Sequence, residues 1–160
     1  MTGRRPTGAV AAALKWGSVG WLLALWVLVA AGVFVRFVPV ASMGWADEIV
    51  ELAFAWMVFM GAAALWRDGS HFCVDFLLLR WGDSPAGRAL QLLVRLLSLA
   101  FLVVFTYYAA VLTLNASDRS PILEYPKVVF YMVMPITGAI MTAYTLRDVW
   151  RCLARGTAGR

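Results

Sequence analysis

Four long apolar runs, separated by short polar segments, dominate the pattern of hydrophobic and polar positions along the chain. They extend roughly over residues 16–35, 46–66, 88–114 and 126–146. Because about 20 consecutive apolar residues suffice for an α-helix to cross the hydrocarbon core of a bilayer, each run predicts a transmembrane helix. The pattern therefore predicts an all-α integral membrane protein in which residues 1–160 form a single four-helix membrane domain.

The borders of the runs carry signals typical of membrane helices. Trp45 and Trp66 lie at the two ends of the second run, 21 residues apart. That separation corresponds to ~31 Å of helix, close to the hydrocarbon thickness, and tryptophan favours both membrane interfaces. Pro126 suits the first turn of the fourth helix, where its missing N–H costs nothing. Pro135, inside that run, is expected to kink the helix.

The composition agrees with this interpretation and narrows the classes of function. Hydrophobic residues make up 62% of the 160 residues, whereas a soluble domain is about half apolar. The net charge of +5 comes from basic residues that flank the apolar runs, so it indicates helix orientation, and we expect no nucleic-acid partner. The first run, at about 20 residues, is too long for a signal-peptide core of about 7–15, so we expect an uncleaved span.

The distribution of Lys and Arg predicts the orientation. Of the 14 basic residues, ten lie in the N-terminus, the middle loop and the tail, and three (Arg36, Arg119 and Lys127) lie in the other two loops. Positive residues stay on the cytoplasmic side. We therefore expect both termini and the middle loop in the cytoplasm, and the first and third loops outside.

The middle loop is not a plain linker. Residues 72–81 are mostly apolar, interleaved with Asp75 and Arg80, and are too few to span. We expect an interfacial segment there, a helix or turn lying in the cytoplasmic interface. Cys73 and Cys152 are too few for a disulfide framework or a zinc motif, and we interpret them as structural or inert.

Acidic residues open the second span. Asp47 and Glu51 are four residues apart and share a helix face, and Glu48 points to a neighbouring one. Acids favour a helix N-terminus through the helix dipole, which is one interpretation for Asp47. For Glu48 and Glu51, deeper in the span, we expect pairing with a cation, and Arg36 at the end of the preceding helix is the nearest candidate.

Two further polar residues leave alternatives open. His71 is the only histidine, so bis-histidine haem ligation within the chain is excluded, and its spacing from Cys73 and Asp75 matches no strong metal motif. We interpret His71 as a loop residue bonding to the backbone or to Asp75. Arg95, seven residues into the third span, either snorkels to the interface or pairs with an acid of a partner subunit.

The sequence contains no recognisable motif for catalysis or for binding a cofactor. There is no Gly-rich phosphate loop, no nucleophile elbow and no pair of carboxylates in a plausible pocket. Polar groups also do not line the middle of any run, which argues against an autonomous pore or substrate path. We therefore expect neither an enzyme nor a chain with its own cofactor or metal.

The order of motifs over residues 36–75 resembles the small membrane subunit (the DctQ-like, or Q, subunit) of tripartite ATP-independent periplasmic (TRAP) transporters. The matching elements are Arg36-Phe37 ending the first span, Trp45-Ala-Asp-Glu48 opening the second, Gly61 within it, and Arg67-Asp-Gly-Ser-His71-Phe-Cys-Val-Asp75 closing it. Four spans, both ends inside and a length near 160 also agree. The third and fourth spans match only in hydropathy and in Pro126, Pro135 and Gly138.

The resemblance implies a multi-pass protein of the bacterial inner membrane that pairs with a large subunit. In that family the large subunit carries substrate and sodium, and a periplasmic binding protein delivers an organic acid such as a C4-dicarboxylate or sialic acid. The small subunit acts as a fixed scaffold. The residues expected at the partner interface or in a structural polar cluster are Arg36, Trp45, Asp47, Glu48, Glu51, His71, Asp75 and Arg95. Candidate contacts to the binding protein are Arg36, Asp118 and Arg119.

Two rival functions come from other classes. A self-sufficient four-span transporter usually has an essential acid inside the first span, and none lies between Trp16 and Val35. A membrane anchor of another complex, such as a redox enzyme, would be expected to hold haem, for which one histidine is too few.

Overall fold

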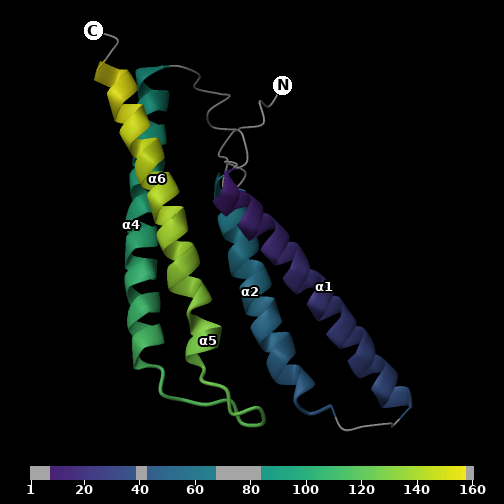
Figure 1. The fold of residues 1–160 in the computed structure, drawn as a ribbon. Helices are drawn as coiled ribbons and strands as arrows, with labels where there is room; N and C mark the ends of the chain where they lie inside the picture. The colour runs from purple at the N-terminus through teal and green to yellow at the C-terminus, as the bar shows by residue number, and fades with distance from the viewer. Residues whose placement is uncertain (1–7, 39–42, 68–83, 158–160) are drawn as a thin grey trace.

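The computed structural model describes residues 8–38, 43–67 and 84–157. Within these ranges the named elements are the helices α1 (Ala9–Phe37), α2 (Ala46–Arg67), α4 (Pro85–Asn115), α5 (Val128–Tyr131) and α6 (Val133–Thr157) (Figure 1). Four segments are long and apolar enough to span a membrane: Ala9–Phe37, Ala46–Trp66, Leu92–Asn115 and Val128–Trp150. The predicted all-α fold with four membrane helices is confirmed, and the expected interfacial segment lies outside the described residues.

Two helices begin earlier than their apolar runs, for local reasons. Alanines at positions 9 and 11–13 have the highest helix propensity, and α1 accordingly begins at Ala9. At the start of α4 the Ser84 hydroxyl accepts the Gly87 N–H at 3.1 Å, and Pro85 takes the first helical position. Hydropathy marks the part of a helix that suits a bilayer, whereas caps and propensity set where the helix begins.

The fourth apolar segment is interrupted at Met132, between α5 and α6. Pro135 lacks the N–H that would bond to the Tyr131 carbonyl, and its ring crowds that carbonyl, so a regular helix cannot continue. The indole N–H of Trp56 on α2 donates to the Val129 carbonyl at 3.1 Å. The interruption therefore gives α2 a polar tie to α5. Pro126 itself precedes the helix, and its carbonyl accepts the Val129 N–H at 3.0 Å.

The helices form a row in the order α1, α2, α6 and α4. α1 packs along α2, α4 packs along α6, and α2 and α6 join the two pairs (Figure 1). No close backbone approach between α1 and α4 occurs within the described residues. The row is open rather than closed around a core, and α1 and α4 each keep an outer face.

Small residues allow the helices of each pair to approach closely. A Cβ at Gly17 of α1 would collide with the Met60 side chain of α2, and Gly61 lies against Ser18. A Cβ at Gly138 of α6 would lie 2.5 Å from the Thr106 Oγ1 of α4. Packing of this kind drives helix association in a bilayer, where lipid tails are as apolar as the side chains.

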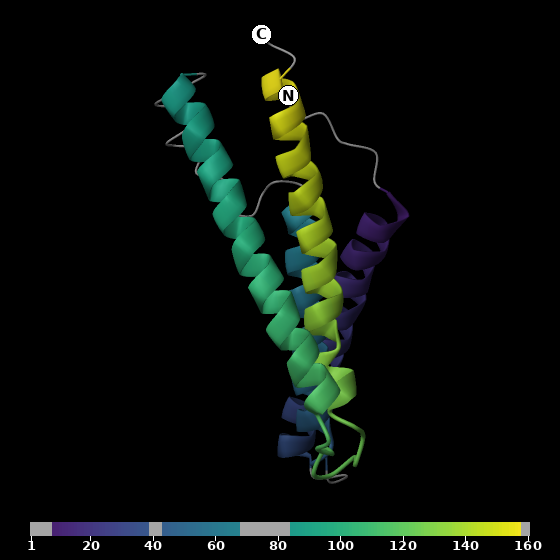
Figure 2. The same ribbon diagram turned by 90° about the vertical axis from the view of Figure 1, so that its left-hand side faces the viewer.

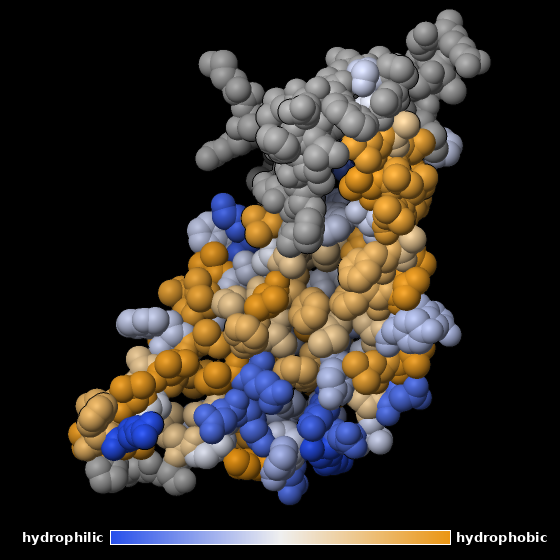
Figure 3. All heavy atoms as spheres, turned by 180° about the vertical axis from the view of Figure 1, so that it is seen from behind, coloured by the Kyte–Doolittle hydropathy of each residue, from blue (hydrophilic) through white to orange (hydrophobic). Residues whose placement is uncertain are grey.

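The two ends of the molecule differ in what they carry. We call the end with the α1–α2 connection and residues 116–127 the loop end, and the opposite end, where α1 begins and α6 finishes, the termini end (Figure 1). Figure 3 shows apolar side chains over the middle of one face and hydrophilic ones gathered at the loop end. This banding suits a molecule that crosses a bilayer with the row standing upright.

Candidate partner surfaces and the polar cluster at the loop end

Glu48 ties the loop that follows α4 to the beginning of α2. One carboxylate oxygen of Glu48 accepts the Ile122 N–H at 2.8 Å, and the other accepts the Leu123 N–H at 3.0 Å. The Ser120 hydroxyl bonds to the same carboxylate, and the positive charge of Lys127 acts on it. Hydrogen bonds to an ionised acceptor are about twice as strong as those between neutral groups. Glu48 is therefore satisfied within the chain.

The loop that Glu48 holds has its own backbone bonds. Ser120 N–H donates to the Tyr125 carbonyl at 3.0 Å, and Lys127 N–H donates to the Asp118 carbonyl at 3.0 Å. Glu124 N–H donates to the Ser120 carbonyl at 3.2 Å, which closes a tight turn. The turn requires Glu124 to adopt a φ of 52°, in the left-handed region that most residues avoid, and this conformation is strained. The loop is thus a defined turn, fixed at its base by Glu48.

Tyr125 lies beside this acidic cluster. Burial, and then the negative charges of Glu48 and Glu51, raise the pKa of the Tyr125 phenol, while a hydrogen bond with Ser120 acts in the opposite direction. The phenol thus stays protonated at neutral pH and adds no charge next to the carboxylates. The cluster has a single carboxylate, Glu48, that bonds to the loop, with Glu51 one turn further along α2.

Three of the acids and cations predicted at this end have no partner within the described residues. Arg36, Asp47 and Glu51 are exposed. Our expectation that Arg36 pairs with Glu48 or Glu51 is not met within the described residues. The reason is geometric: the end of α1 stands apart from the start of α2 (Figure 1), and the loop offers backbone donors to Glu48. Asp47 lies in the first turn of α2, as the helix-dipole interpretation expects.

The remaining predicted site residues fall in several places. Trp45 is 38% exposed at the start of α2, and Asp118 and Arg119 are exposed on the loop. Arg95 is partly exposed on α4, toward the termini end. His71 and Asp75 lie outside the described residues. The structure therefore brings Glu48, Glu51 and the loop together, and places Arg36 and Arg95 elsewhere.

Sequence reasoning missed the partners of Glu48 and the roles of two tryptophans. The donors to Glu48 are mostly backbone groups, which no residue type reveals. The only signal is the apolar pair Ile122-Leu123 inside a polar loop. Trp66 was predicted as an interface anchor, and in the structure its indole N–H also donates to the Thr145 hydroxyl at 2.8 Å. Together with Trp56, it ties α2 to the fourth segment near both of its ends.

The described side chains do not assemble reactive chemistry. Within the described ranges there is no group of three or more His, Cys, Asp and Glu residues that would hold a metal ion. The buried polar side chains in these ranges are Ser120, Thr137 and Thr145, all of them hydroxyls. The hydroxyls of Thr137 and Thr145 and the carboxylate of Glu48 are hydrogen-bonded and hold structure, whereas the buried Thr106 Oγ1 has no hydrogen-bond partner.

The outer faces of α1 and α4 are broad apolar surfaces. The α1 face consists of Trp16, Leu23, Trp26, Val27, Val33, Phe34 and Phe37, all between 53% and 79% exposed. The α4 face consists of Leu93, Leu97, Phe101, Val104 and Tyr108, between 53% and 66% exposed. The α4 residues are three or four positions apart, and the α1 residues are one, three, six or seven apart; both kinds of spacing keep a set on one side of its helix. In a bilayer such faces meet lipid or the helices of another subunit.

Comparisons with known proteins agree with this picture of a membrane component. The family model for the DctQ component of tripartite ATP-independent periplasmic transporters matches residues 25–155. A C4-dicarboxylate TRAP transporter small permease protein of Rhodobacter capsulatus is 35% identical over 107 residues, which is 62% of this chain and 45% of that protein. This chain thus matches less than half of the length of that relative. The family is a transporter component and not an enzyme. With four membrane helices and a family match over most of its length, this chain belongs to the DctQ component family of TRAP transporters.

Proposed function

We propose that this chain is the small permease subunit of a TRAP transporter, acting as a fixed scaffold for a large membrane subunit that moves the substrate. The observation that carries the proposal is the open row of helices with two large outer apolar faces. A chain that transported a solute by itself would need a polar path, and within the described residues the buried polar groups are the side chains of Ser120, Thr137 and Thr145 and the Thr106 Oγ1. An open row of helices with exposed apolar faces suits a subunit that packs against a larger membrane protein.

The α1 face and the α4 face are the proposed surfaces for the large subunit and for lipid. Arg36, Asp47 and Glu51 are exposed and unpaired within the described part of the chain, so their charges remain for a partner to match. Glu48 acts differently. Because its carboxylate is bonded to the loop, we propose that it contributes to assembly by holding the loop end in shape.

The loop end is the proposed contact for a periplasmic binding protein. Arg36, Asp118 and Arg119 are exposed there, beside the exposed Glu124. The excess of basic residues at the termini end supports an orientation with both termini in the cytoplasm of a bacterial inner membrane. The loop end would then face the periplasm.

The proposed substrate class is an organic acid, carried by the large subunit. The relative from Rhodobacter capsulatus is named for C4-dicarboxylates, which makes these the first substrates to test. Sialic acid or a similar carboxylate is the alternative that the family resemblance leaves open. Coupling to sodium is likewise assigned to the large subunit, a proposal supported by the lack, in the described residues, of a group of three or more His, Cys, Asp and Glu that could hold a metal ion.

The deciding experiment is purification of tagged chain from its native membrane in mild detergent, with mass spectrometry of what accompanies it. We expect a stoichiometric large multi-span subunit. Proteoliposomes with both subunits should then take up a C4-dicarboxylate when binding protein and a sodium gradient are supplied, whereas this chain alone should not. A chain that purified alone as a homo-oligomer and transported by itself would replace the scaffold proposal with a self-sufficient transporter.

A further inference from the structure

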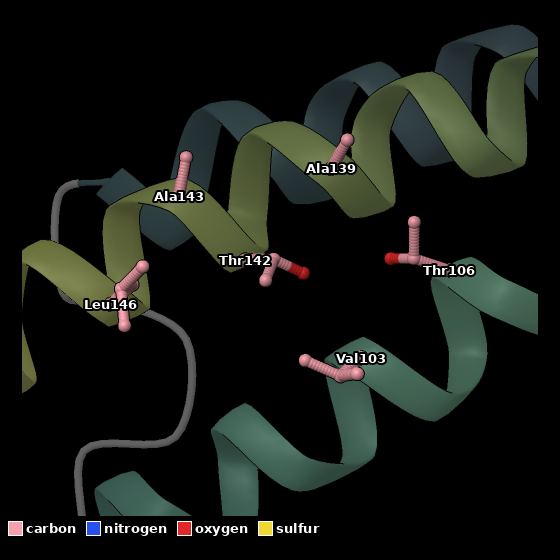
Figure 4. Close-up of a pocket in the computed structure, with 6 residues that line it drawn as sticks. All are labelled: Val103, Thr106, Ala139, Thr142, Ala143 and Leu146. Atoms are coloured by element: carbon pink, nitrogen blue, oxygen red, sulfur yellow. The ribbon is translucent and has the colours of Figure 1, made fainter.

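A groove runs between α4 and α6 on the surface of the row. Its volume is about 380 Å³. Its lining residues are Val103 and Thr106 of α4, and Ala139, Thr142, Ala143 and Leu146 of α6 (Figure 4). The Thr142 hydroxyl is already used, because it donates to the Gly138 carbonyl at 2.7 Å. The walls therefore present mostly hydrocarbon to whatever fills the groove.

The groove is closed at one end and open at the other. The closed end is the neck where Gly138 meets Thr106, with no space for even a Cβ between them. Toward the termini end α4 and α6 diverge, as Figure 2 shows. The groove thus begins in the middle of the spans and opens in the direction of one membrane surface.

Two arginines lie beyond the lining residues in the direction of the open end, one on each of the two helices that form the groove. Arg95 precedes Thr106 by eleven residues, which is three helical turns, so both lie on the same side of α4, ~16 Å apart along the axis. Arg147 follows Gly138 by nine residues, or ~14 Å, which is two and a half turns, so it lies on the other side of α6 from Gly138. It is one turn beyond the lining residue Ala143 and therefore lies at the outer edge of the groove. The two cations are therefore level with each other, about half of a ~30 Å hydrocarbon core away from the neck.

Neither arginine is neutralised by an acid of the part of the chain that the structure describes. Arg95 is partly exposed and Arg147 is exposed, and within the described residues neither forms an ion pair. Trp150, which is 73% exposed, lies in the same last turns of α6. Tryptophan and arginine at this depth are typical of the level of lipid headgroups.

We propose that this groove is a binding site for an anionic phospholipid, with an acyl chain along the walls to the neck and the phosphate held between Arg95 and Arg147. Three matches favour a lipid over a helix of another subunit. The walls are mostly apolar, the length along the helices from the arginines to the neck equals one leaflet, and both helices carry a cation at the headgroup level. Under the orientation proposed above, the lipid belongs to the cytoplasmic leaflet, where anionic lipids attract basic residues.

The test uses the full chain reconstituted in nanodiscs that contain equal amounts of phosphatidylglycerol and phosphatidylcholine. Lipid retained after transfer to mild detergent is counted by native mass spectrometry. We expect wild-type chain to retain phosphatidylglycerol in preference to phosphatidylcholine. Retention should fall about fivefold for each of Arg95→Gln and Arg147→Gln, the effect of about 1 kcal/mol per basic side chain near a membrane surface. Arg36→Gln, an exposed arginine at the loop end, is the matched control and should leave retention unchanged.

A second variant separates the groove from simple surface attraction. Ala143→Phe fills the groove while keeping both arginines, and it should lose the retained lipid. If it does not elute as a single species, Ala139→Leu, at an exposed wall position, replaces it. Equal retention of the two lipids, retention that survives the double arginine variant, or retention in the filled groove would each overturn the proposal. So would a cross-link from Ala143→Cys to the large subunit in the intact complex. Lipid retention is measured on this chain alone, so its failure is distinguishable from failure of the scaffold function.

Discussion

Glu48 at the loop end and two arginines at the termini end of this protein differ in how their charges are matched. At the loop end, Glu48 finds two backbone N–H groups, at 2.8 and 3.0 Å, on the loop that follows α4. At the termini end, Arg95 and Arg147 stand beside a widening groove and form no ion pair within the described residues. One charge organises the chain that carries it, and the other two have no opposite charge paired with them in the described ranges.

Whether a charged side chain has a partner within its own chain indicates what the charge does. A charge with an internal partner supports the fold, and a charge without one is available to another molecule. A charge next to hydrocarbon is costly unless it is matched, so the location of its partner indicates its role. Glu48 is matched internally, and changing it should alter the protein's own shape. Arg95 and Arg147 have no ion-pair partner among the described residues, and under our lipid proposal changing them should alter what the protein binds while leaving its fold intact.

The strongest test of the loop end is Glu48→Ala. The substitution leaves the N–H groups of Ile122 and Leu123 without their acceptor, so we expect the loop to detach from α2. The melting temperature should fall by several degrees, and recovery of the complex with the large subunit should decrease. Thermal unfolding followed by tryptophan fluorescence, together with co-purification yield, measures both effects.

Glu51→Ala is the matched control for that experiment. Glu51 is on the same helix one turn away but is exposed and makes no hydrogen bond within the described residues. It should leave the melting temperature nearly unchanged, and any effect should appear only in assembly. If the two variants lowered the melting temperature equally, the hydrogen bonds of Glu48 would not distinguish it from Glu51, and our assignment of a structural role to Glu48 would be wrong.

The neck between the two ends is tested by Gly138→Ala. The new methyl group would lie 2.5 Å from the Thr106 Oγ1 and 3.3 Å from the Phe105 ring. Overpacking of this kind costs about 1–3 kcal/mol, more than the helix propensity that alanine adds. Gly17→Ala should cost less, because its obstacle is the flexible end of Met60. Unfolding in mixed micelles gives both values, and a double variant with Thr106→Ala should recover most of the loss at Gly138.

Much of the fold, but little of the polar cluster, was accessible from the sequence. Hydropathy predicted four membrane helices because the bilayer imposes one length on all of them. The first helix begins at Ala9 because of the helix propensity of alanine, and α4 begins at Pro85 because Ser84 caps it. Hydropathy does not report either of these effects. The acids of α2 were recognised, but Glu48 was expected to pair with Arg36. Its real partners are main-chain groups 74 and 75 residues away, and side-chain types carry no information about them.

Thr106→Val should stabilise the closed end of the groove. The Thr106 Oγ1 is buried and has no hydrogen-bond partner, whereas the hydroxyls of Thr113, Thr137, Thr142 and Thr145 each donate to the carbonyl four residues earlier. Removing an unsatisfied buried hydroxyl gains about 1 kcal/mol. Thr142→Val on the facing wall is the control, because it gives up a hydrogen bond and should be neutral or slightly destabilising. Equal effects of the two would mean that the Thr106 hydroxyl has a partner after all.

The smallest change in stability is expected for Glu124→Gly, at the loop end. Glu124 adopts a φ of 52° to close the turn that Glu48 anchors. Relief of left-handed strain is worth about 1–2 kcal/mol, and the extra freedom of glycine in the unfolded chain takes back about 0.5–1 kcal/mol. The net gain should be about 1 kcal/mol or less, measured as a small rise in melting temperature. In the background of Glu48→Ala the gain should shrink, because a detached loop no longer imposes that φ. An equal gain in both backgrounds would mean that the turn keeps its conformation without Glu48, and the carboxylate would then position the loop against α2 without shaping it.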